Sequence, residues 1–295
     1  MNKWMMVIRT PFLLLPVALA VLGTAAAWYD GAFHWGHAVM AFAGLLLAHI
    51  SVNVLNEYHD YQSGVDFKTK RTPFSGGSGA LPQGLVTPRQ ALILGWAALL
   101  VNVPLGIYFC LVKGWGLLPL LVAGAVTIVL YTPVFLKMGY PEWAPGLGLG
   151  ALPVLGLYFV QTGQYTLTAL AAAVPPFLLV HNLLLLNEFP DMEADRSSGR
   201  RSLPIAAGRK KAARLYAAFN VLVYVWIAAS VAAGWMQVPV LLGLLTIPFA
   251  VNGIRGALNS TDPKRLMPGM ASNVMMVLLT QVLMGAGFVL AGILA

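Results

Sequence analysis

Charged residues are scarce in this chain of 295 residues: only 9% are Asp, Glu, Lys or Arg, whereas 59% are apolar. An ordinary soluble protein has about 25% charged residues, because its surface must be compatible with water. The scarcity of charge therefore excludes a soluble globular enzyme. The high apolar content also excludes a disordered chain. The single cysteine, Cys110, excludes an internal disulfide and a metal site built from cysteines.

Long apolar stretches stand where a soluble protein would have charge. A helix that crosses a bilayer needs about 20 mostly apolar residues, so we predict an all-α, polytopic membrane protein with nine transmembrane helices in one domain, residues 1–295. We expect the first stretch to be a retained helix and not a cleaved signal peptide. The expected spans are 11–29, 37–56, 90–111, 115–135, 145–162, 166–187, 213–234, 237–254 and 270–294.

Positive charge is distributed unevenly among the segments that join these spans. With the N-terminus inside, all 18 lysines and arginines except Lys113 fall in inside segments. This bias is the one that sets the orientation of membrane proteins. The net charge of +8 is therefore interpreted as a topology signal and not as a sign of nucleic-acid binding. We expect a cytoplasmic N-terminus and a C-terminus on the outside.

The few acidic residues gather in two short segments at the inner ends of expected spans. All 10 except Asp30, Glu142 and Asp262 lie within residues 57–66 or 188–195. Carboxylates at the end of an apolar span cost free energy and repel one another unless cations compensate them. Helical spacing puts three polar side chains of each segment on one face: Asn53, Asn56 and Asp60 in the first, and Asn187, Asp191 and Asp195 in the second.

The two segments form a weak internal repeat, with halves of about 1–140 and 141–295, and each leads into a basic loop. Gly64 is expected to end the first helix and let Asp66 fold back, and Pro190 to kink the second. Mg²⁺ is held by one or two carboxylates plus substrate phosphates, and lysine and arginine supply the remaining charge. We therefore predict two Mg²⁺ ions that clamp one diphosphate. The predicted ligands are Asn56, Asp60, Asp66, Asn187, Asp191 and Asp195.

With these motifs, the chain resembles the UbiA superfamily of intramembrane aromatic prenyltransferases over essentially its whole length. Arg9-Thr10-Pro11 also resembles the family's start of the first span. Within the family the chain is most similar to the menaquinone-type branch, through residues 56–66, 84–90, 131–140 and 158–163. Glu57, Phe189-Pro190 and the glycine-rich run Gly76-Gly77-Ser78-Gly79 depart from the usual pattern and bear on acceptor specificity.

This resemblance implies a nine-helix bundle whose active site faces the cytoplasmic side of a prokaryotic plasma membrane. The implied reaction transfers a polyprenyl group from its diphosphate to an aromatic acceptor, 1,4-dihydroxy-2-naphthoate. Asp60, Asp66, Asp191, Asp195 and Lys137 are the expected catalytic residues. Tyrosine rings can stabilise an allylic cation through their faces. The candidates for contact with the diphosphate or the prenyl group are Arg9, Asn53, Lys68, Arg71, Tyr131, Tyr140, Tyr158, Arg200 and Arg201.

Two kinds of alternative stay open. The same chemistry could act on another acceptor, such as 4-hydroxybenzoate, homogentisate, a chlorophyll precursor, haem or a glycerol phosphate lipid. A transporter would also carry acidic residues in its spans. It would place them at mid-membrane in several spans, whereas the acids here lie at the inner ends.

Overall fold

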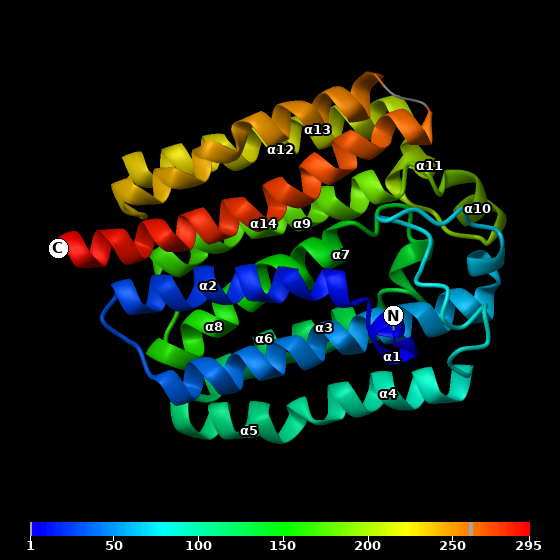
Figure 1. The fold of residues 1–295 in the computed structure, drawn as a ribbon. Helices are drawn as coiled ribbons and strands as arrows, with labels where there is room; N and C mark the ends of the chain where they lie inside the picture. Colours follow the sequence, from blue (N-terminus) through cyan, green and yellow to red (C-terminus); the bar gives the residue numbers. More distant parts are fainter. Residues whose placement is uncertain (1, 260–261) are drawn as a thin grey trace.

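The computed structural model describes residues 2–259 and 262–295, and every element in these ranges is helical. Side chains of residues 263–265, which include the basic residues Lys264 and Arg265 expected inside, are outside the described set. The long helices lie side by side (Figure 1). The N-terminal helix α1 (Lys3–Val7) lies toward the same end as α10 (Met192–Ser197) and α11 (Leu203–Ala207), and the C-terminus lies at the other end.

Within the described residues, eight helical stretches are long and apolar enough to cross a membrane, and Trp115–Leu130 is a shorter apolar helix at the place of the predicted fourth span. The predicted all-α membrane bundle is therefore confirmed. The division into two repeat halves stays a prediction. The spans are η1 and α2 (Thr10–Leu13, Leu14–Tyr29), α3 (Trp35–Ser63), α4 and α5 (Pro88–Leu100, Asn102–Lys113), η3 and α6 (Trp115–Leu117, Leu118–Leu130), α7, η5 and α8 (Trp143–Gly146, Leu147–Ala151, Leu152–Thr162), α9 (Leu167–Asn187), α12 (Arg209–Ala232), η6 and α13 (Val238–Thr246, Ile247–Asn259) and α14 (Pro263–Leu294).

Small residues let the central helices pack closely. Helix α2 lies between α14 and α8 (Figure 1). A Cβ added to Gly23 of α2 would lie 2.8 Å from the Leu157 Cβ of α8, and one added to Gly285 of α14 would lie 2.8 Å from the Val21 Cγ1 of α2. Helices in lipid associate through such close backbone approach, because apolar side chains gain little by leaving the lipid. The largest core cluster joins α2, α8, α9, α12 and α14.

The first acidic segment forms as the sequence predicts. Helix α3 continues to Ser63, so Asn53, Asn56 and Asp60 lie on one uninterrupted helix. Gly64 then takes a left-handed conformation, with φ of 75°, which glycine adopts without a steric penalty. The following turn η2 (Val65–Phe67) carries Asp66 back into a buried position.

The second acidic segment differs from the prediction of one kinked helix face. Helix α9 ends at Asn187, residues 188–191 form turns, and Asp191 is the residue that precedes α10. The expectation of a single helix face over 187–195 is therefore wrong. Pro190 has no N–H to donate and its ring clashes with the preceding turn, so it ends the helix here and does not merely kink it.

Candidate functional site

A polar cavity of about 120 Å³ lies where the two acidic segments meet. Residues from α3, η2, the end of α9 and α10 converge on it although more than a hundred residues separate the two segments. The expectation that the two segments face each other is therefore met by the fold. All of the predicted Mg²⁺ ligands line this cavity, namely Asn56, Asp60, Asp66, Asn187, Asp191 and Asp195.

Protein contacts hold the first acidic segment in place. The Asn53 Nδ2 donates to the Ile8 carbonyl at 3.1 Å, and the Asn56 Nδ2 donates to the Thr132 Oγ1 at 3.0 Å. Glu57 is fully buried and accepts from the Arg9 Nε at 2.6 Å. Its two oxygens also accept from the backbone N–H and the hydroxyl of Ser78, each at 2.7 Å. Glu57 thus anchors Arg9 at the cavity wall and is not solvated.

Several buried oxygen atoms around the cavity have no hydrogen-bond partner. They are the Asp66 Oδ2, the Asn187 Oδ1 and both carboxylate oxygens of Glu188. Buried polar atoms are normally paired, and carboxylate and amide oxygens are the ligands that Mg²⁺ prefers. These residues therefore fit a hard cation. Among the described residues, no three His, Cys, Asp or Glu side chains are grouped so that they could hold a metal ion by themselves.

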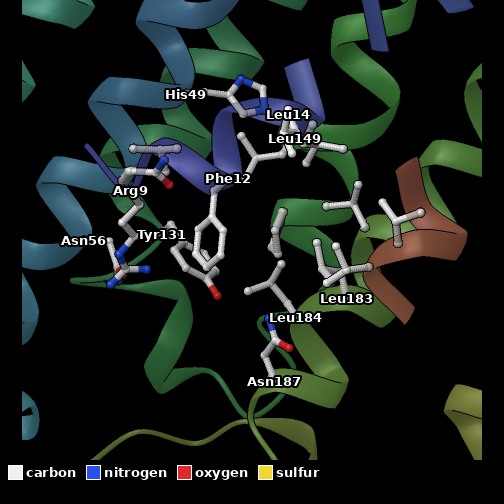
Figure 2. A pocket seen from close by; sticks show the side chains of 18 of the residues that line it. Arg9, Phe12, Leu14, His49, Asn56, Tyr131, Leu149, Leu183, Leu184 and Asn187 are labelled. Carbon is white, nitrogen blue, oxygen red and sulfur yellow. The ribbon is translucent and has the colours of Figure 1, made fainter. Parts of the chain in front are cut away.

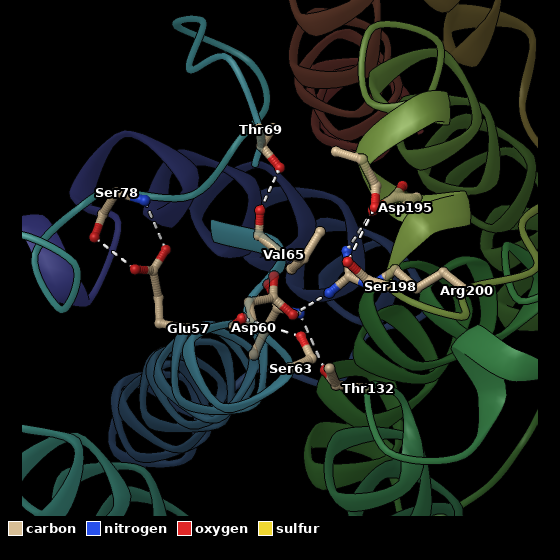
Figure 3. Close-up of polar contacts among 12 residues, drawn as sticks. Glu57, Asp60, Ser63, Val65, Thr69, Ser78, Thr132, Asp195, Ser198 and Arg200 are labelled. Carbon is tan, nitrogen blue, oxygen red and sulfur yellow. Dashed lines mark hydrogen bonds and ion pairs between the residues drawn. The ribbon is translucent and has the colours of Figure 1, made fainter. Parts of the chain in front are cut away.

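Arg200 joins the two acidic segments directly. Its guanidinium forms an ion pair with Asp60 of the first segment and donates to the Asp195 Oδ1 of the second at 2.9 Å (Figure 3). Burial by itself would lower the pKa of the Arg200 guanidinium, but the two carboxylates outweigh burial and raise it. Arg200 therefore stays charged, and it spans the gap in which a cation or a diphosphate would lie.

The remaining carboxyl groups lack enough positive charge. Burial, followed by the neighbouring Asp60 and Glu57, raises the pKa of Asp66 to about 7. Burial and then Asp195 raise the pKa of Asp191 to about 7. Without further cations these groups hold protons near neutral pH, since their ionised forms are poorly compensated. When ionised, the carboxylates around the cavity thus carry more negative charge than Arg9 and Arg200 compensate.

Sequence reasoning did not assign a role to Glu188 or Glu142. Glu188 lines the cavity, and burial followed by the nearby Glu142 raises its pKa well above the usual value. Glu142 is fully buried and its Oε1 accepts from the Leu203 N–H at 2.7 Å. The position of Glu188 directly after the motif residue Asn187 was the available signal. Glu142 offered no such signal in the sequence, because it follows a loop that contains no other acidic residue.

Four of the predicted phosphate-binding cations do not line this cavity. Lys68, Arg71, Lys137 and Arg201 are exposed. Lys68 instead donates to the Ser197 carbonyl at 3.3 Å and so ties η2 to the end of α10. The Arg201 backbone N–H donates to the Leu136 carbonyl at 2.8 Å. Long, solvated side chains in loops carry the orientation signal without being fixed at a site, so only Arg9 and Arg200 line the cavity as predicted.

Only one of the three predicted tyrosines reaches the site. Tyr131 lines the polar cavity and the adjoining apolar pocket. The Tyr140 hydroxyl is instead 2.8 Å from the His181 Nε2. Tyr158 is fully buried, and its hydroxyl bonds Asp30 and Thr166 at the far end of α8. The assignment of Tyr158 is corrected for this reason: residue 158 lies near the C-terminal end of the span 145–162, away from the acidic segments.

An apolar pocket of about 250 Å³ adjoins the polar cavity (Figure 2). The predicted Asn53 lies in its wall. A larger apolar cavity of about 430 Å³, between α3, α5, α6 and α8, shares Ile128 and Gly148 with this pocket. A polar space for a charged head group thus adjoins apolar spaces for a long tail. The residues that line both the polar cavity and the apolar pocket are Arg9, Phe12, Asn56, Phe74, Tyr131, Leu184 and Asn187.

Comparison with known protein families identifies the family of this chain. The model of the UbiA prenyltransferase family matches residues 13–279. The chain belongs to the UbiA prenyltransferase family. It is therefore an integral membrane prenyltransferase, and its long apolar helices are membrane spans.

Relatives of this UbiA family member carry several names. It is 28% identical to the 1,4-dihydroxy-2-naphthoate octaprenyltransferase of Bacillus subtilis, over 76% of this chain and 71% of the relative. It is 27% identical to the Escherichia coli enzyme of the same name, over 98% and 96%. It is also 25% identical to the digeranylgeranylglyceryl phosphate synthase of Pyrococcus horikoshii, over 83% and 80%.

A solved UbiA homologue shares the fold. The structure from Archaeoglobus fulgidus bound to GPP and Mg²⁺ superimposes with a TM-score of 0.66 at 14% identity, covering 97% of this chain and 99% of that one. At this identity the likeness establishes the fold of the UbiA family member described here.

Proposed function

We propose that this prenyltransferase transfers a polyprenyl group, in a Mg²⁺-dependent reaction, from its diphosphate to an aromatic acceptor, 1,4-dihydroxy-2-naphthoate, in menaquinone biosynthesis. The observation that carries the proposal is the convergence of all six predicted Mg²⁺ ligands on one cavity that shares a wall with an apolar pocket. The names of the Bacillus subtilis and Escherichia coli relatives support the choice of acceptor, and the GPP and Mg²⁺ bound to the Archaeoglobus fulgidus homologue support the donor and the metal.

The polar cavity binds the diphosphate, and the apolar pocket together with the larger apolar cavity beside it binds the prenyl chain and the acceptor ring. Asn56, Asp60, Asp66, Asn187, Asp191 and Asp195 would hold two Mg²⁺ ions. When bound, Mg²⁺ supplies positive charge that stabilises the leaving diphosphate. Arg200 and Arg9 add charge from the protein itself, which lowers the barrier to breaking the bond between the prenyl carbon and the diphosphate oxygen.

The apolar pocket protects the reaction from water. The bonding electrons leave with the diphosphate, and the allylic cation that forms faces Tyr131, whose ring stabilises it by about 2 kcal/mol when desolvated. A ring carbon of the acceptor then attacks the cation, and the acceptor's carboxyl group leaves as carbon dioxide. Exclusion of water from the pocket suppresses hydrolysis of the cation.

The proposed setting is a prokaryotic plasma membrane with the polar cavity on the cytoplasmic side. The loops around this cavity carry Lys68, Arg71, Lys137 and Arg201, which agrees with the positive-inside bias. The N-terminus would then be cytoplasmic and the C-terminus outside. This placement gives the site access to a soluble acceptor from one side and to a lipid-borne donor from the bilayer.

One reconstitution assay tests the proposal. Purified protein in liposomes is supplied with a labelled polyprenyl diphosphate and a panel of acceptors, with Mg²⁺ or with EDTA. We expect prenylated 1,4-dihydroxy-2-naphthoate with Mg²⁺ and none with EDTA. No product from any acceptor would overturn the proposal. Product from 4-hydroxybenzoate, homogentisate or a glycerol phosphate lipid, but not from dihydroxynaphthoate, would replace the acceptor.

A further inference from the structure

A buried histidine lines the apolar pocket away from the acidic segments. His49 lies on α3, its side chain is part of the pocket wall, and only 2% of the residue is exposed. In Figure 2 it lies at the opposite end of the pocket from Asn187. Polar groups buried within a membrane span are costly and generally have a function. His49 has no part in holding the diphosphate.

The hydrogen bonds of His49 fix which ring nitrogen carries the proton. The Nδ1 lies 3.0 Å from the Leu45 carbonyl oxygen, which can only accept. The Nδ1 is therefore the protonated nitrogen, and in the neutral ring the Nε2 is a bare acceptor. The ring is neutral because an imidazolium without a counter-ion in an apolar pocket would be strongly disfavoured.

The Nε2 of His49 is buried and has no hydrogen-bond partner. Other polar side chains in the pocket wall are engaged elsewhere: the Thr127 hydroxyl donates to the Gly124 carbonyl at 2.8 Å, and the Asn53 amide donates to Ile8. An unpaired buried acceptor costs roughly 1–3 kcal/mol. Apart from the Asn187 Oδ1, which lies where the pocket meets the polar cavity, His49 thus brings an unused lone pair to the pocket wall, and this end of the pocket suits a ligand that is apolar apart from one donor.

A prenyl chain has no hydrogen-bond donor, whereas a hydroxylated aromatic ring has one. We propose that the His49 Nε2 accepts a hydrogen bond from a ring hydroxyl of the aromatic acceptor, and thereby selects hydroxylated rings and orients them. This inference rests on the proposed function, because it places the acceptor of that reaction in the apolar pocket. It assigns His49 to binding the acceptor, a role that no residue of the acidic segments has.

The position of His49 on α3 sets the direction of the ring. His49 precedes Asn56 by seven residues, which is two helical turns and about 10 Å along the axis, so both project from one face. The bound hydroxyl then points away from the diphosphate, and the opposite part of the ring faces the polar cavity, where the prenyl carbon is released. Phe12 and Leu149 are among the apolar residues of the pocket wall.

The test compares two acceptors on three proteins. The acceptors are a hydroxylated aromatic substrate and its methyl ether, which carries an added methyl group and cannot donate. The proteins are the wild type, His49→Leu and His49→Gln, the last of which retains an acceptor oxygen. His34→Leu is the matched control, because His34 is exposed and does not line the cavities. The measured quantities are KM and kcat for each acceptor at saturating polyprenyl diphosphate, and KM for the diphosphate.

We expect the wild type to prefer the hydroxylated acceptor over its methyl ether by about 10-fold or more in kcat/KM, the loss expected for one unpaired buried group. His49→Leu should lose this preference, mainly through KM for the hydroxylated acceptor, and should leave KM for the diphosphate unchanged. His49→Gln should restore part of the preference, and His34→Leu should retain all of it.

Two outcomes would overturn the inference. One is equal use of the two acceptors by the wild type, a result that does not depend on any variant folding. The other is an undiminished preference in His49→Leu. In both cases prenyl transfer itself would continue, so the proposed function would stand. Absence of any prenylated product with the wild type would instead remove the proposed function.

Discussion

The two acidic segments face one cavity but are held in different ways. In the first segment, α3 runs unbroken to Ser63, and Asn53, Asn56 and Glu57 are fixed by contacts with other parts of the chain. In the second, the helix ends at Asn187, and the Asn187 Oδ1 and both Glu188 oxygens have no partner. The first segment is therefore preassembled by the protein except at the Asp66 Oδ2, which has no partner, whereas the second has three such oxygens and is completed by what binds to it.

This difference separates two roles that the repeat in the sequence makes look equal. A preassembled carboxylate face positions a ligand without reorganisation. A face with unpaired buried oxygens has a higher free energy until a cation arrives, so it binds that cation more strongly. Variants of the two segments, and of the arginine between them, test whether the two roles differ in this way.

The largest effect is expected from removing one carboxylate charge in each segment. Asp60→Asn and Asp191→Asn should each lower kcat for prenyl transfer by roughly 10²–10³-fold, as the loss of a single preorganised electrostatic group does elsewhere. Glu193→Gln is the control, because Glu193 belongs to the second segment but is exposed and does not line the cavity. Full activity in either Asp variant, measured with labelled polyprenyl diphosphate, would contradict the metal assignment.

A smaller effect is expected from cutting the link between the segments. Arg200→Met leaves Asp60 and Asp195 without their shared cation, so KM for the polyprenyl diphosphate should rise roughly 10- to 100-fold. Thermal unfolding without metal should also occur at lower temperature, and added Mg²⁺ should restore part of the loss. Arg201→Met, at an exposed neighbour, should change neither quantity. Equal behaviour of the two variants would exclude Arg200 as the link.

The smallest effect concerns pH. The pKa of Asp66 and of Asp191 is about 7 without metal, raised from 3.8. Both carboxyls are mostly protonated below pH 7, and protons then compete with Mg²⁺. Lowering the pH from 8 to 6 should weaken Mg²⁺ binding about tenfold for each carboxyl that must lose its proton. Calorimetric titration should show proton release on binding, and an Mg²⁺ affinity independent of pH in this range would contradict the assignment.

The same shifts fix the sign of the stability change. A carboxyl with a raised pKa holds its proton more tightly in the folded state than in the unfolded state. The folded metal-free protein therefore loses stability as the pH rises from about 4 to 7. Bound Mg²⁺ should remove this loss, because it compensates the ionised form. Unfolding temperatures with EDTA and with Mg²⁺ at pH 6 and 8 measure both effects.

The spans and the main cavity residues could be predicted because they depend on local properties. Apolar runs of about 20 residues mark the helices, and polar residues spaced three or four apart share a helix face. Gly64 also reveals itself locally, since only a left-handed residue returns Asp66 to the cavity. Asn56 and Asp60 were found in this way, whereas Asn187 and Asp195 line the cavity although the helix face on which they were placed does not form.

Other features depend on which distant segments become neighbours, and no local pattern encodes that. Glu142 meets Glu188 across the fold, and Glu57 meets Ser78 and Arg9. Basic loop residues such as Lys137 could not be sorted from Arg200, because the orientation signal and a phosphate site use the same residue types. Tyr158 was assigned to the site from the family resemblance. Its actual partner, Asp30, lies at the end of another span, which no local pattern reveals.

The shared wall between the polar cavity and the apolar pocket also bears on product release. Besides carbon dioxide, the proposed reaction has two products that differ in kind: inorganic diphosphate dissolves in water, and a prenylated ring dissolves in lipid. Each can leave through the medium in which it is soluble, and neither has to pass the other. Such a catalyst separates its products into two phases, so that their recombination at the site is disfavoured by dilution on both sides.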